Sequence, residues 1–288
     1  MLKRRIAANL VVKDGIVVQS INFRKYLPLG KPAIAIEFLN QWGIDEIILT
    51  DISATKNKSE PNYQLVKQAS TKCFVPLTVG GGITNIDQIK ELMHCGADKI
   101  SLNQSAIHNS SLITNAAKIF GDQCVVVSID TMIEETSFKV FDYIRHKTIN
   151  VPPAEFAKRA EDLGAGEILI NSVDRDGSYL GYDLELINSI CNVVKVPVIC
   201  CGGAKNAKDF IEVFSKTRVS AASAANFYHF TEHSVNSTKA NINKQIPVRL
   251  ETFANYQDGT FDNSLRLQKK EDRVLEEMLF IQIEKEVI

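Results

Sequence analysis

Short apolar runs rich in β-branched residues alternate along this chain with longer stretches in which apolar residues recur every three or four positions. Eight of the short runs predict buried strands, at residues 6–12, 46–49, 75–79, 99–102, 124–129, 167–170, 196–200 and 219–222. Helices are predicted between them, for example at residues 33–42, 86–95, 154–163 and 207–214, because a proline or an asparagine of the kind that starts helices stands at the beginning of each.

Alternating strands and helices predict a parallel sheet. Eight such units within about 250 residues fit a closed (β/α)₈ TIM barrel. An open doubly wound sheet is the structural alternative, but no Gly-x-Gly-x-x-Gly follows the first strand. We therefore expect an α/β chain with a single (β/α)₈ barrel over residues 1–253 and a C-terminal extension over residues 254–288.

An internal repeat predicts how this barrel is built. Val75-Pro76, Gly81-Gly82 and Asn85 recur 121 positions later as Val196-Pro197, Gly202-Gly203 and Asn206, and Glu46 recurs as Glu167. The chain therefore consists of two half-barrels of four units each. A barrel whose halves correspond is suited to a ligand with two similar ends.

The composition is that of an ordinary globular protein, with 45% hydrophobic residues and 33 basic side chains against 34 acidic ones. This balance argues against a nucleic-acid binder, and no run of 18 apolar residues suggests a membrane span. The six cysteines show neither a Cys-x-x-Cys pair nor the spacing of a zinc site. We therefore expect reduced, mostly buried thiols, a cytoplasmic protein, and neither metal nor cofactor.

Glycine clusters follow the third and seventh predicted strands, as Gly80-Gly81-Gly82 and Gly202-Gly203. Barrel enzymes assemble their sites at the carboxyl ends of the strands, where glycine lets backbone N–H groups approach an anion. Tight turns explain one such pair equally well, but two clusters at the repeat offset favour phosphate binding. The residues expected to complete two phosphate cradles are Asn103, Gly177, Ala225 and Asn226.

Carboxylates gather at the same ends: Asp51, Asp130, Asp174, Asp176 and Asp183. Each could move a proton or hold a substrate hydroxyl. Loop capping is the alternative, and for Asp174 and Asp183 both interpretations stay open. Asp130 closes a largely apolar strand, where partial burial would tune its pKa.

Charged residues stand at the opposite ends of four strands: Arg5, Glu46, Lys99 and Glu167. Two cations and two anions at one level can close a ring of salt bridges. Taken from the residues alone, a plug that closes the barrel bottom is favoured over a functional gate.

The chain resembles the cyclase subunit of imidazole glycerol phosphate synthase, from histidine biosynthesis. The resemblance runs from Met1 to about Phe253 and rests on Asp130 and on these motifs: Lys13-Asp14-Gly15, Gly43-Ile44-Asp45-Glu46, Asp51-Ile52-Ser53-Ala54, Val79-Gly80-Gly81-Gly82-Ile83, Gly96-Ala97-Asp98-Lys99, Gly164-Ala165-Gly166-Glu167-Ile168-Leu169 and Asp174-Arg175-Asp176-Gly177.

The resemblance implies a heterodimer in which a glutamine amidotransferase (glutaminase) subunit supplies ammonia through the barrel core. The ammonia is added to a bisphosphorylated ribulosyl formimino-aminoimidazole carboxamide ribotide, which is split and cyclised to imidazole glycerol phosphate. Arg5, Glu46, Lys99 and Glu167 then match the gate at the ammonia entrance, and Asp98 matches a residue of the glutaminase interface. The gate interpretation thereby replaces that of a plug.

The departures from the family pattern fall on the chemistry. Family members pair two catalytic aspartates, and here Asp130 is kept whereas Val11 stands at the other position. General acid–base catalysis typically raises a reaction rate about 10²–10⁴-fold. Because valine has no proton to exchange, one of the two groups that would provide it is missing. Other expected lysine or hydroxyl positions carry amides: Gln19, Gln104, Asn171 and Asn226.

Three hypotheses follow. The first is the histidine-pathway synthase subunit with reduced or altered activity. The second is a diverged paralogue that keeps the glutaminase coupling but delivers ammonia for amidination of a surface-polysaccharide sugar. The third is a non-catalytic scaffold for a glutaminase; intact Asp130 and the intact gate argue against it.

The periodic pattern ends after Phe253. Residues 255–288 are rich in charge around a late apolar cluster that begins at Val274. A partner-binding segment and a poorly ordered tail are alternatives, and we expect a helix docked on its own chain.

Overall fold

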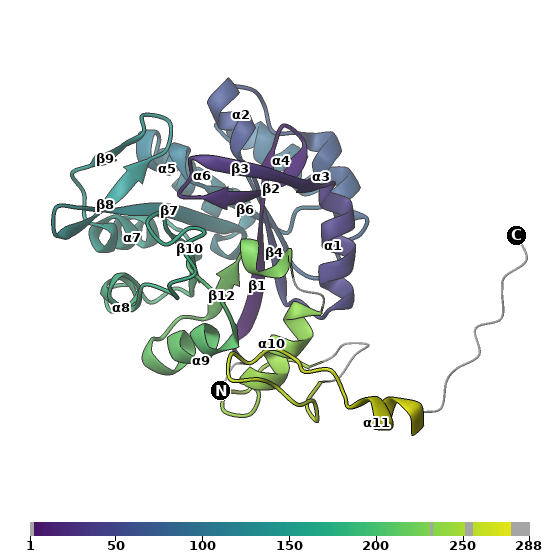
Figure 1. Ribbon diagram of the computed structural model, residues 1–288. Coiled ribbons are helices and arrows are strands. Elements are labelled where there is room, and N and C mark those ends of the chain that lie inside the picture. Colours follow the sequence, from purple (N-terminus) through teal and green to yellow (C-terminus); the bar gives the residue numbers. More distant parts are fainter. Residues whose placement is uncertain (1–2, 231–232, 251–255, 278–288) are drawn as a thin grey trace, which may run out of the picture.

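The computed structural model describes residues 3–230, 233–250 and 256–277, and it contains the expected closed barrel (Figure 1). Its parallel strands follow one another around the barrel, and the last pairs again with the first. They are β1 (Arg5–Lys13), β4 (Glu46–Asp51), β5 (Leu77–Gly80), β6 (Lys99–Leu102), β7 (Val125–Glu134), β10 (Glu167–Ser172), β11 (Val198–Cys201) and β12 (Ala221–Ala224). All eight predicted strands are confirmed.

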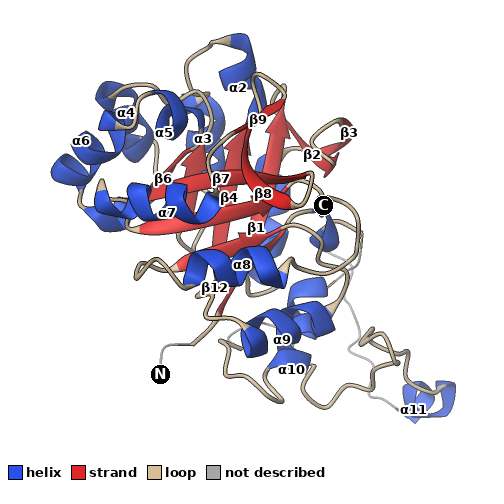
Figure 2. Ribbon diagram, turned by 90° about the vertical axis from the view of Figure 1, so that its left-hand side faces the viewer, coloured by secondary structure: helices blue, strands red, loops and turns tan. Residues whose placement is uncertain are grey.

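Helices cover the outside of the barrel (Figure 2). They are α1 (Pro32–Gln41), α2 (Ile52–Asn57), α3 (Tyr63–Ser70), α4 (Ile86–His94), α5 (Gln104–His108), α6 (Ser111–Phe120), α7 (Pro153–Asp162), α8 (Leu184–Cys191), α9 (Ala207–Lys216) and α10 (Ser234–Ile242), with short 3₁₀ turns η1 (Asp122–Cys124) and η2 (Asn226–Tyr228). Side-chain caps mark the predicted starts of α4 and α9, whereas α1 and α7 begin at a proline without one. Asn85 accepts a hydrogen bond from the Gln88 N–H, and Asn206 forms a capping box with Asp209.

Two β-hairpins rise above the carboxyl ends of the strands, and the sequence pattern did not predict them. One consists of β2 (Ile16–Ile21) and β3 (Lys25–Gly30), and the other of β8 (Ser137–Asp142) and β9 (Lys147–Ile149). The bounds of β8, β10 and β11 lie 121 positions after those of β2, β4 and β5. The two-half repeat is therefore confirmed, and it includes the hairpins.

The core has two parts, because the side chains of a barrel strand alternate between its inside and the helices. The inside is filled by Ile48, Val126, Leu169, Ile199 and Ala221. A larger apolar cluster lies between strands and helices. All six cysteines are free thiols, but only Cys191 and Cys200 are buried; the prediction of mostly buried thiols is wrong, since four are half-buried.

The C-terminal extension contains a helix, α11 (Asp272–Glu277). Before this helix, the extension contacts the barrel at Lys244, which follows α10. The Lys244 ammonium lies 5.0 Å from the centre of the ring of Phe261 in the extension. Asp272, Arg273 and Val274 are exposed. Most of the apolar cluster expected to dock lies in residues 278–288, outside the described part, so the docking of this helix stays a prediction. None of the described helices is long and apolar enough to cross a membrane.

Candidate active site

A cavity of about 330 Å³ opens at the carboxyl ends of the barrel strands. It brings together residues that the sequence analysis singled out from both halves: Val11, Gly81, Gly82, Asn103, Asp130, Asp176, Gly202 and Ala225. The predicted residues Gly177, Gly203 and Asn226 line a separate void of only about 20 Å³, together with Asp176, Gly202 and Ala225. The two expected cradles are therefore unequal in this structure.

The Gly81-Gly82 side opens onto the large cavity. Gly81 has a φ of +115°, and a Cβ atom there would lie 2.1 Å from the Asp51 carbonyl oxygen, so close approach alone requires glycine. The Gly82 N–H already donates to Thr55 Oγ1 at 3.0 Å. The tight-turn interpretation thus holds for Gly81, and phosphate binding on this side stays a prediction. Lys58 lines the same cavity and offers it a positive charge.

The hairpin β2–β3 is bonded to residues on the Gly202-Gly203 side. The Asn226 amide donates to the Ser20 carbonyl oxygen at 2.6 Å and accepts from the Ser20 N–H at 3.2 Å. Asp176 Oδ2 accepts from Ser20 Oγ at 2.6 Å and from the Phe23 N–H at 3.2 Å. The void beside these residues has a volume of about 20 Å³, whereas Gly202 and Ala225 also line the large cavity, and phosphate binding on this side stays a prediction.

Asp130 lies on the cavity floor and is 7% exposed. Asn171 Nδ2 donates to its Oδ1 at 2.8 Å. Burial raises the pKa of Asp130 to about 6, against hydrogen bonds from Asn171 and Asn103 that lower it; the Asp176 carboxylate adds to the rise. A carboxyl group with a pKa near 6 is poised to exchange protons near neutral pH.

Val11 and Asp130 occupy matching places in the two halves. Val11 pairs in register with Thr50 of β4, and Asp130 pairs in register with Asn171 of β10, which stands 121 positions after Thr50. Val11 is 9% exposed and lines the same cavity, but it has no proton to exchange.

Three aromatic side chains line the cavity, and the sequence analysis missed them: Phe23, Tyr26 and Tyr143. They come from the loops and strands of the two hairpins, and the Phe23 and Tyr143 rings meet edge to face at 6.4 Å. Burial raises the pKa of both tyrosines, so both hydroxyls stay protonated at neutral pH. Predicting the hairpins would have identified them.

The other predicted carboxylates have structural partners. Asp51 caps α2 by accepting from the Ser53 and Ala54 N–H groups, and Asp183 caps α8. Asp174 Oδ2 accepts from the Ile133 N–H at 2.7 Å. Loop capping accounts for all three.

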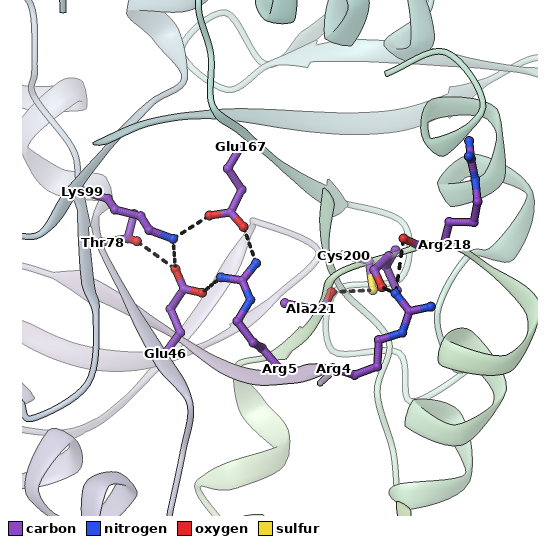
Figure 3. A network of polar contacts seen from close by, with 10 residues as sticks. Arg4, Arg5, Glu46, Thr78, Lys99, Glu167, Cys200, Arg218 and Ala221 are labelled. Atoms are coloured by element: carbon purple, nitrogen blue, oxygen red, sulfur yellow. Dashed lines mark hydrogen bonds and ion pairs between the residues drawn. The ribbon is translucent and has the colours of Figure 1, made fainter. Parts of the chain in front are cut away.

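The charged ring at the opposite mouth has formed (Figure 3). Lys99 Nζ lies 2.9 Å from Glu46 Oε1 and 2.7 Å from Glu167 Oε2. Arg5 pairs with the same two carboxylates from the other side. Burial lowers the pKa of Lys99, but the two carboxylates outweigh it and raise that pKa overall. The predicted convergence of the four side chains is confirmed.

Asp98 stands beside this ring, immediately before Lys99. Its Oδ2 accepts from the Leu77 N–H at 2.8 Å, which ties β5 to the start of β6. The structure thus places Asp98 at the mouth where the family resemblance expects a partner.

Comparisons with known proteins agree with this architecture. A family model described as histidine biosynthesis protein matches residues 5–234. The chain is 42% identical over 263 residues to a putative imidazole glycerol phosphate synthase subunit hisF2 of Vibrio vulnificus, covering 91% of this chain and 97% of that one. It is 44% identical over 241 residues to the subunit HisF of Clostridium botulinum, covering 83% and 95%. The chain belongs to the HisF family.

Family membership confirms the resemblance read from the motifs, and with it an enzyme of histidine biosynthesis. The chain is also 41% identical over 253 residues to a HisF subunit of Lactococcus lactis. This match covers 87% of this chain and 98% of that one. The ring at the amino-terminal mouth and Asp130 lie where the resemblance expects them, whereas Val11, Gln104 and Asn171, which line the cavity, depart from the pattern that the resemblance implies.

Proposed function

We propose that this chain binds a glutaminase subunit at its amino-terminal mouth and uses the ammonia released there at the cavity on the other end of the barrel. The heterodimer works in the cytoplasm. The observation that carries the proposal is the pairing, within one barrel, of a closed charged ring at one mouth with a buried carboxyl group at the other.

Ammonia then follows the barrel axis. The ring of Arg5, Glu46, Lys99 and Glu167 acts as the gate, and Asp98 contacts the partner beside it. Beyond the gate lies the apolar interior formed by residues such as Ile48 and Leu169. A neutral molecule such as ammonia can pass through this lining. An ion is excluded, because an unpaired charge in an apolar interior is strongly disfavoured.

The acceptor in this proposal is the bisphosphorylated ribulosyl carboxamide ribotide, and the product is imidazole glycerol phosphate. Asp130 serves as the general base or acid. One phosphate lies against the Gly81, Gly82 and Asn103 side, and the other lies against Gly177, Gly202, Gly203, Ala225 and Asn226 with Asp176 nearby, once the hairpin β2–β3 has moved away.

The test is turnover by the purified complex. The chain and a glutaminase subunit are supplied with the ribulosyl bisphosphate substrate, and with either glutamine or ammonium as the nitrogen source. Imidazole product from both sources supports the proposal. Product from ammonium but not from glutamine would contradict the glutaminase coupling. Absence of product from both sources would contradict the cyclase activity.

A second candidate is favoured by Val11, which leaves Asp130 as the one aspartate of the expected pair. In that case the chain is a paralogue that delivers glutamine-derived ammonia to a different acceptor, a sugar of a surface polysaccharide. Robust imidazole formation in the experiment above would exclude it.

A further inference from the structure

Asn171 is the polar side chain closest in register to the buried carboxyl group. Asn171 of β10 and Asp130 of β7 are direct partners in the parallel ladder, so both side chains point into the barrel at one level. The Asn171 amide donates to Asp130 Oδ1 at 2.8 Å and to Ser128 Oγ at 3.1 Å. Thr131 Oγ1 in turn donates to the Asn171 carbonyl oxygen at 2.9 Å, which fixes the strand position.

The first half of the barrel lacks this arrangement. Its counterpart of Asn171 is Thr50, which is paired in register with Val11. The Thr50 hydroxyl donates to Asn9 Oδ1 at 3.3 Å instead. The two half-barrels therefore have the same strand pairing at this level. The second half places a carboxylate and an amide donor there, whereas the first half places Val11 and Thr50.

The hydrogen bond has two consequences for Asp130. An N–H that donates to a carboxylate favours the ionised form, and so it opposes the desolvation of this buried group. It also occupies Oδ1 and so fixes the orientation of the carboxyl group on the wall of the cavity that Asp130 lines. The groups that act on Asp130 besides Asn171 are the Asn103 amide and the Asp176 carboxylate, and Tyr26 and Tyr143 face it from the hairpins. Val11 contributes no charge.

We propose that Asn171 is a positioning residue: it holds Asp130 by Oδ1 and favours the ionised carboxylate that accepts a proton from the substrate. This inference rests on the proposed function, in which Asp130 exchanges a proton with the substrate, and it assigns Asp130 the role of the base. It assigns to Asn171 a role in proton transfer, in addition to any effect on the size of the cavity.

The decisive measurement is the titration of Asp130 itself. Asp carboxyl carbons are labelled with ¹³C and followed by NMR from pH 4 to 9, and Asp130→Asn identifies the signal. Asn171→Leu keeps the approximate size of the side chain but removes the donor, and Asn171→Ala does so if the leucine variant fails to fold. We expect the midpoint, about 6 in the parent chain, to rise by about one to two pH units, the shift that losing a hydrogen bond to a charged group produces.

Thr50→Val is the matched control, because it removes the corresponding hydroxyl in the other half of the barrel. It should leave the Asp130 midpoint unchanged. In turnover assays with ammonium, the acidic limb of the kcat profile of Asn171→Leu should move by the same amount. Activity at pH 7 should then fall about two- to tenfold and recover at pH 9.

An unchanged Asp130 midpoint in a folded Asn171→Leu or Asn171→Ala chain would overturn the inference, whatever happens to activity. The titration needs neither substrate nor partner. A failure of the proposed function, seen as absence of imidazole product, therefore leaves this test intact.

Discussion

Val11→Asp would restore a second carboxyl group to the cavity. Val11 and Asp130 line the same cavity from matching places in the two half-barrels. Valine and aspartate are similar in size, so the substitution changes charge far more than shape. If the remaining pocket is that of the family, two carboxyl groups can again divide the roles of acid and base.

The structure sets the expected cost in stability. Burial raises the pKa of Asp130 to about 6, about two units above its ordinary value, so a carboxylate in this cavity costs about 3 kcal/mol of stability at neutral pH. We expect Val11→Asp to lower the free energy of unfolding by about that amount at pH 8, and by less at pH 5. Imidazole formation should rise at least about tenfold, or about 1.4 kcal/mol of barrier.

The gain should stay incomplete because Gln19, Gln104, Asn171 and Asn226 are unchanged. Gln104 and Asn226 line the voids where the phosphates are expected, so we expect them to affect KM more than kcat, whereas Asn171 bonds Asp130 and acts on kcat. The assay measures imidazole product with saturating ammonium, which removes any dependence on the glutaminase. Val11→Asn is the control, because it has the same shape without a titratable proton. If Val11→Asp folds, binds the bisphosphate and forms no more product than Val11→Asn, the missing acid is not the obstacle.

Three further outcomes are expected. Because burial raises the pKa of Asp130, the folded chain binds that proton more tightly than the unfolded chain, and stability falls as pH rises from about 4 to 6. Asp130→Asn should therefore be about 3 kcal/mol more stable than the parent at pH 8 and little changed at pH 4 in urea titrations; equal stability at both would contradict the raised pKa. Lys99→Met removes two ion pairs with buried carboxylates and should lower the free energy of unfolding by about 3 kcal/mol. The variant should also form fewer imidazole products per glutamine hydrolysed. Lys90→Met, at an exposed ion pair, should change neither quantity. Crystals soaked in phosphate should show an anion against Gly81-Gly82 at lower concentration than against Gly202-Gly203, and two empty sides would count against phosphate recognition.

Most of the barrel could be predicted because its strands are buried on both faces and therefore are short, continuous apolar runs. The predicted starts at Val75 and Val196 were early, since β5 and β11 begin at Leu77 and Val198. Pro76 and Pro197 have no N–H to donate, so pairing begins after them. The hairpins escaped prediction because β3 is mostly exposed and contains Pro28.

The candidate site was predictable as far as barrel geometry determines it. Carboxyl ends of parallel strands meet at one rim, so Asp130, Gly81 and Gly202 had to lie together. The bond between Asn226 and Ser20 was not predictable, because it joins residues 206 positions apart and depends on how a hairpin folds over the rim. The same holds for the contact of Asn171 with Asp130, which needs the register of two strands.

The hairpin β2–β3 also joins the two halves of the chain across the rim. Five hydrogen bonds connect its residues 20–23 to Asp176 and Asn226, so the first half of the chain is fastened to the second. Under the proposed function, a substrate phosphate that enters between Asn226 and Gly203 requires these bonds to break, and the product leaves in the same way. We then expect the movement of the hairpin to limit turnover, so that a more viscous solvent slows it even when proton transfer is fast.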